Sequence, residues 1–96
     1  MQDKLGVYYN PIPGNKGLRT YIRLNNNDIE FRLWSAEDPE LWDEHGWVPW
    51  TAIKEAERLY TAEGKGKRPP MHLYDLEIAF RLLKDFVQDY FHAKGN

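Results

Sequence analysis

The chain has 96 residues, a formal net charge of −2 and no cysteine. This length allows one hydrophobic core, so we expect residues 1–96 to form a single domain. The lack of cysteine excludes disulfides, thiolate metal sites and cysteine nucleophiles, and the charge argues against a globally basic binder of nucleic acid or membranes. Neither a secretory signal nor an apolar run of membrane-spanning length is visible, so we expect a cytoplasmic protein.

Residues 1–10 precede the clearest pattern in the chain. The segment LGVYY at 5–9 is compatible with a strand, and the prolines and glycines of NPIPGNKG that follow cannot continue a ladder. We therefore expect 1–10 to add a loose edge strand to a sheet.

Residues 18–34, LRTYIRLNNNDIEFRLW, alternate between apolar and polar on both sides of an asparagine cluster that tolerates positive φ. This predicts an antiparallel hairpin turning at Asn26 and Asn27. The predicted pairs on the apolar face are Leu24 with Ile29, Ile22 with Phe31, and Thr20 with Leu33. The predicted pairs on the other face are Arg23 with Glu30, Tyr21 with Arg32, and Arg19 with Trp34. A slip of one residue would mix the two faces, so the pattern fixes the register.

Two helices are predicted next. Asp38, Pro39 and Glu40 form a start signal, because the first caps, the second suits the first helical position and the third favours the positive end of the dipole. Gly46 supplies the stop, giving a short helix over 39–45. A second helix over 50–62, starting at Pro49 or Thr51, carries one apolar stripe, and the basic run EGKGKRPP at 63–70 reads as an exposed loop.

The last helix, over 72–93, has an apolar arc of about half its circumference, wider than one contact surface needs. One part of this arc should cover the hairpin, and the part with Ile78, Leu82 and Phe86 should meet a second contact. The predicted fold is therefore α+β: a β-hairpin or three-stranded meander packed on one face by a short helical turn and two helices.

The stretch EDPELWDEHGWVPW at 37–50 gathers acids, a histidine and three tryptophans. Acid and base roles need side chains that converge in a pocket, whereas residues of one short helix diverge, so we predict no catalytic site at Asp38 and His45. Ligand spacing for a metal is also lacking, and we predict neither metal nor cofactor. Trp42, Trp47 and Trp50 are expected to cap the core, and an exposed one would make a protein-docking patch.

Two functional hypotheses remain. The first is a small non-catalytic interaction or regulatory module, with a protein partner or a homodimer formed through Ile78, Leu82 and Phe86. The second is binding of single-stranded nucleic acid on the second hairpin face, where guanidinium groups alternate with aromatic rings. The residues of this candidate face are Arg19, Tyr21, Arg23, Arg32 and Trp34. The same residues would also form favourable cross-strand pairs on an exposed face without any ligand.

Overall fold

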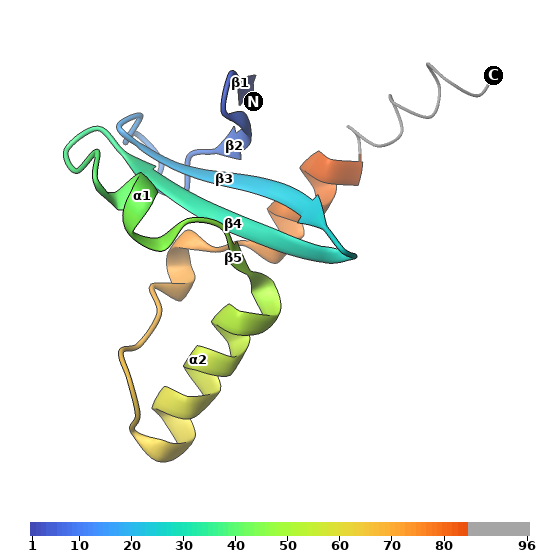
Figure 1. Ribbon diagram of the computed structural model, residues 1–96. Helices are drawn as coiled ribbons and strands as arrows, with labels where there is room; N and C mark the ends of the chain where they lie inside the picture. The colour runs from blue at the N-terminus through green and yellow to red at the C-terminus, as the bar shows by residue number, and fades with distance from the viewer. Residues whose placement is uncertain (85–96) are drawn as a thin grey trace.

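The computed structural model describes residues 1–84, and in this part of the chain one antiparallel sheet of five strands forms the centre of the molecule (Figure 1). The strands follow one another in space as they do in sequence, which is a meander. They are β1 (Gln2–Asp3), β2 (Gly6–Tyr9), β3 (Leu18–Asn25), β4 (Asp28–Ser35) and β5 (Val48–Pro49). The α+β class and the meander predicted from the sequence are confirmed.

The central hairpin of β3 and β4 has the predicted register at every pair, from Leu24 opposite Ile29 to Arg19 opposite Trp34. Asn26 and Asn27 have φ of 52° and 64°, the left-handed values that a two-residue hairpin turn of type I′ requires. The predicted third strand is also present, because Val7 of β2 pairs with Ile22 of β3.

Both edges of the sheet differ from the expectation. On one side β2 is not the edge, because Gln2 of β1 pairs with Val7 and extends the sheet. On the other side β5 pairs with β4 through Phe31 and Val48, in a segment that we expected only to link two helices. The first ten residues are therefore built into the sheet rather than loosely attached.

The helices are α1 (Leu41–His45), α2 (Trp50–Glu63), the 3₁₀ turn η1 (Met71–Leu73) and a helix over 76–84. The second predicted helix is confirmed, and it ends where Gly64 adopts φ 66° and its amide donates to the Tyr60 carbonyl. The predicted cap of the first helix is wrong: α1 begins at Leu41 with Glu40 in the cap position, and no side chain of residues 1–84 caps it. The Ser35 hydroxyl instead accepts the Glu37 amide at 3.3 Å, which turns the chain as it leaves β4 and delays the helix.

The last helix begins later than predicted. Asp75 caps it, since its carboxylate accepts the Ile78 amide at 3.0 Å and its carbonyl accepts the Ala79 amide. The rest of the predicted helix, including Phe86, lies outside the described residues. Within residues 1–84 no helix is long and apolar enough to cross a membrane.

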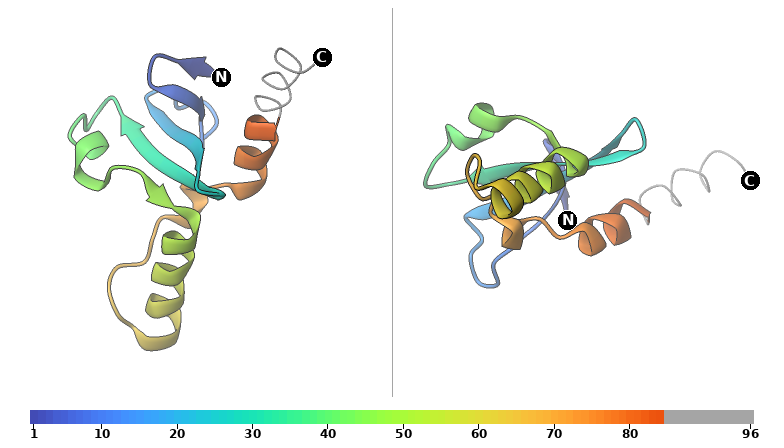
Figure 2. Two further views of the ribbon diagram at one scale, coloured as in Figure 1. Left: turned by 45° about the vertical axis from the view of Figure 1, so that its right-hand side comes forward. Right: turned by 90° about the horizontal axis from the view of Figure 1, so that it is seen from below.

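The hydrophobic core lies on one face of the sheet. Its buried members come from three strands and two helices: Tyr9, Ile22, Phe31, Ile53 and Ala79. The α2 helix reaches this core with its first turns and then projects away from the sheet (Figure 1). The α1 helix and the 76–84 helix lie on opposite sides of the sheet (Figure 2), so both faces are covered.

The Tyr9 side chain fixes the start of the last helix. Its hydroxyl donates to the Leu73 carbonyl at 2.9 Å and accepts the Asp75 amide at 2.7 Å. The Thr20 hydroxyl donates to the same Leu73 carbonyl at 2.9 Å. Burial raises the pKa of Tyr9 to about 12, so the phenol remains a donor at neutral pH.

Candidate functional site: the arginine–aromatic face and a groove beside helix α2

The predicted nucleic-acid face does bring its residues together, but other elements cover much of it. Strand alternation places Arg19, Tyr21, Arg23, Arg32 and Trp34 on the sheet face opposite the core. Tyr21 packs between the rings of Tyr8, at 5.1 Å, and Trp42 of α1, at 5.2 Å. Its exposed fraction is 0%. The expectation of an exposed face is therefore wrong at its centre, and no base could stack on Tyr21.

Each arginine of this face contacts both an aromatic ring and a carboxylate. The guanidinium groups lie 3.9 to 4.7 Å from the ring centroids of Trp42, Trp47, Tyr8 and Trp34. The ion pairs are Arg19 with Asp3 at 2.9 Å, Arg23 with Glu30 at 2.5 Å, and Arg32 with Asp43 at 3.6 Å. Phosphate groups would have to compete with these carboxylates, so the arrangement favours a structural role for the face.

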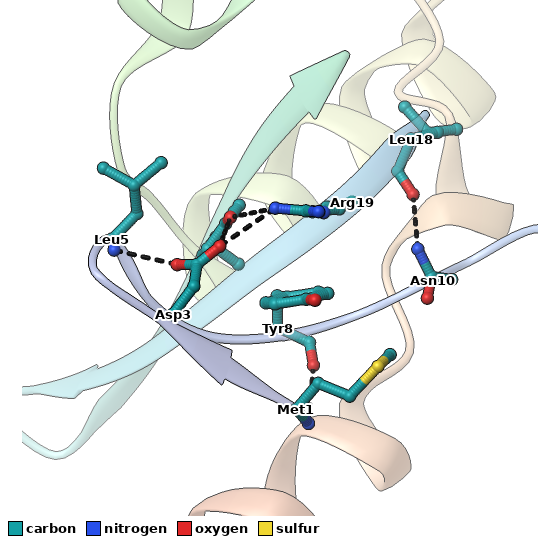
Figure 3. Close-up of polar contacts among 8 residues, drawn as sticks. Met1, Asp3, Leu5, Tyr8, Asn10, Leu18 and Arg19 are labelled. Carbon is teal, nitrogen blue, oxygen red and sulfur yellow. Dashed lines mark hydrogen bonds and ion pairs between the residues drawn. The ribbon is translucent and has the colours of Figure 1, made fainter. Parts of the chain in front are cut away.

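Asp3 joins the N-terminal hairpin to this face (Figure 3). Its carboxylate accepts hydrogen bonds from the Leu5 amide at 2.8 Å, from Arg19 at 2.9 Å and from the Tyr21 hydroxyl at 2.5 Å. Burial alone would raise the pKa of Asp3, but these hydrogen bonds and the charge of Arg19 together hold it below its ordinary value of 3.8. The β1 strand is thereby held to β3 although it has only two residues.

The three tryptophans of the 37–50 stretch are all half-buried. Trp50 packs on Phe31 at 5.9 Å and belongs to the core side. Trp42 and Trp47 meet edge to face, with ring centroids 6.2 Å apart, and cover the arginine–aromatic face. Only Trp50 therefore packs on the core as predicted, whereas Trp42 and Trp47 lie on the opposite face of the sheet.

The acidic residues around α1 gather at the surface. Carboxylate oxygens of Asp38, Glu40 and Glu44 lie within 4.8 Å of one another, and all three residues are exposed. His45 is 3.9 Å from Glu44 and also exposed. Spacing in the sequence did not predict this proximity, which arises from the turn before α1. Exposed carboxylates alone do not define a cation site.

A groove that the sequence did not reveal lies between α1, the first half of α2 and the loop that returns to η1. It has a volume of about 470 Å³ and a lining that is mostly apolar. Its apolar residues include Leu41, Val48, Ala52, Ile53, Ala56 and Tyr74. His45, Lys67 and Arg68 are also in the lining. Asp38 does not line the groove, so the groove does not unite Asp38 with His45.

Part of the interface predicted on the last helix packs on the sheet, and part of it is exposed. Leu82, which we expected to be free for a partner, packs against the core cluster instead. Ile78 is 36% exposed and Phe80 is 61% exposed. The sheet covers the centre of the apolar arc and leaves its two margins open.

No protein-family model matches this chain, and searches of curated proteins and of solved structures found no match. A function assigned to it therefore has to rest on its own residues.

Proposed function

We propose that this chain is a non-catalytic interaction module of the cytoplasm that associates as a homodimer through one flank of the 76–84 helix. The observation that carries the proposal is Phe80, a large apolar side chain that is 61% exposed on a helix whose neighbouring apolar residues pack on the sheet. Leaving such a ring in water forgoes on the order of 2 kcal/mol of burial, which a partner would recover.

The residues around Phe80 are complementary to a second copy of themselves. Glu77, Phe80, Arg81 and Lys84 follow the i, i+3, i+4, i+7 spacing and so share one stripe of the helix. In an antiparallel pair centred between Phe80 and Arg81, Glu77 faces the partner's Lys84 and Phe80 faces the partner's Arg81. Each contact then occurs twice, as a two-fold interface requires. The ion pair of Arg81 with Glu77, at 2.7 Å within one chain, leaves both groups on this flank.

This interface replaces part of the one predicted from the sequence. Leu82 is engaged in the core, so the dimer is proposed through the Phe80 flank rather than through Ile78 and Leu82. One helix flank is a small contact, and we therefore expect weak association that depends on protein concentration.

Light scattering after size exclusion, over a wide concentration range, tests the proposal. The mass should rise from 11.4 kDa toward twice that value, and Phe80→Glu should keep it at the monomer value. Tyr60→Glu is the matched control, since Tyr60 is 40% exposed on α2, and it should leave the association unchanged. Glu77→Lys should weaken the dimer by repulsion from the partner's Lys84, and Glu77→Lys with Lys84→Glu should restore it. A monomeric mass at every concentration would refute the dimer.

A further inference from the structure

The groove beside α2 has the form of a binding site for part of another molecule. Its lining includes small and branched side chains of β5 and α2, namely Val48, Ala52, Ile53 and Ala56. Because alanine side chains are small, an occupant of the groove can come close to the backbone of α2. Its volume of about 470 Å³ lies in the range of roughly 300–1,000 Å³ that is usual for ligand sites.

Apart from the Tyr74 phenol, the ionisable side chains in the groove lining are basic. Lys67 and Arg68 come from the loop that runs back beside α2 (Figure 1), and His45 comes from the last residue of α1. No carboxylate of the described residues is in the lining. Lys67 and Arg68 form no ion pair with any residue in 1–84, whereas Lys54 and Arg58 of α2 are paired with Glu57 and Glu55. A negatively charged occupant would thus find two cations that no carboxylate of residues 1–84 neutralises.

We propose that this groove binds an acidic peptide segment of a partner protein, with one or two apolar side chains inserted between α1 and α2. The carboxylates of the segment would lie against Lys67 and Arg68. The groove is only partly enclosed, which suits a side chain carried by a larger body better than a small molecule that needs to be enclosed. This inference deepens the proposed interaction role, but it does not require the dimer.

Fluorescence anisotropy with a labelled peptide, EEDLLFDEE, tests the proposal. The control peptide EEDSGSDEE keeps the charge and lacks the apolar anchor. We expect saturable binding of the first with a dissociation constant on the order of 10–100 µM, and binding of the control at least about tenfold weaker. Equal binding of the two peptides would overturn the proposal, because the apolar lining would then contribute nothing, and so would flat curves for both.

Matched variants locate the site. Lys67→Glu with Arg68→Glu should weaken binding of EEDLLFDEE by about tenfold or more, and Lys65→Glu, in the same loop but outside the lining, should change it by less than about twofold. Ala56→Trp should block the groove, whereas Ala62→Trp on the exposed part of α2 should not. If circular dichroism shows that Ala56→Trp is unfolded, the charge variants alone decide whether the groove is the binding site. Unchanged affinity in the Lys67 and Arg68 variant would overturn the site.

Two further arms separate this proposal from its rivals. Phe80→Glu should bind the peptide as the wild type does, so that failure of the dimer and failure of the groove can be told apart. An unlabelled single-stranded RNA should not displace the peptide at moderate salt. RNA could instead displace the peptide from the wild type but not bind the variant with Lys67→Glu and Arg68→Glu. That result would overturn the peptide proposal in favour of a general polyanion site.

Discussion

The two faces of the sheet are both covered, but by different chemistry. The core face is closed by apolar side chains from α2 and the last helix on Ile22 and Phe31. The opposite face is closed by aromatic rings that stack on guanidinium groups, with a carboxylate beside each arginine. Polar residues in a strand therefore need not face water, because arginine stems and rings form a second packed layer. This comparison predicts that the core face carries more of the stability.

The largest effect is expected for Phe31→Ala. Phe31 is fully buried against the rings of Trp50 and Tyr74, so the variant should lose about 3–5 kcal/mol of unfolding free energy. Urea unfolding followed by tryptophan fluorescence measures the loss. Leu24→Ala is the control, since Leu24 lies on the same strand pair and is 54% exposed, and it should cost less than about 0.5 kcal/mol. Similar losses in both variants would contradict the assignment of the core face.

A smaller effect is expected for Trp42→Ala on the opposite face. The variant loses the edge contact with Tyr21 and the guanidinium of Arg32 at 3.9 Å, and it should cost about 1–3 kcal/mol because Trp42 is only half-buried. A double-mutant cycle with Tyr21→Leu should give a coupling of about 0.5–1.5 kcal/mol. Strict additivity would mean that the two rings do not stabilise each other.

The smallest effect is expected for Asp3→Asn, and it should depend on pH. The hydrogen bonds and Arg19 lower the pKa of Asp3 in the folded state, so its ionised form stabilises the fold above the ordinary value of 3.8. This stabilisation is lost as the pH falls through the lowered pKa. The difference in melting temperature between the wild type and Asp3→Asn should therefore be present at pH 7 and disappear at the acidic end. A difference that stays constant with pH would show that the Asp3 charge has no such role.

The hairpin could be predicted from the sequence because alternation and the Asn26–Asn27 turn act locally. The β5 strand could not, because two residues carry no pattern and pair only after α1 has brought them back to β4. Burial of Tyr21 also depends on that return, which places Trp42 over it. The start of the last helix was within reach: Asp75 lies three residues before Ile78 and is a typical cap.

The candidate sites also divide into those set by local sequence pattern and those formed only when distant segments meet. The five residues of the arginine–aromatic face were predicted to lie together, since they alternate along one hairpin. The groove was not predicted, because α1, α2 and the loop with Lys67 and Arg68 meet only in the folded chain. The exposure of Phe80 depends on how far the 76–84 helix extends beyond the sheet, and helical periodicity does not determine this.

The hydrogen bond between the Tyr9 hydroxyl and the Asp75 amide joins positions 66 residues apart. Such a contact forms only after a long loop has closed, which is slow compared with formation of the local hairpin. During synthesis from the N-terminus, the sheet can form while its core face still lacks Leu73 and Ala79. Because α2 covers only part of this face, Ile22 and Phe31 would stay partly accessible until the last helix has left the ribosome, so the growing chain exposes apolar sheet surface to chaperones before its fold is complete.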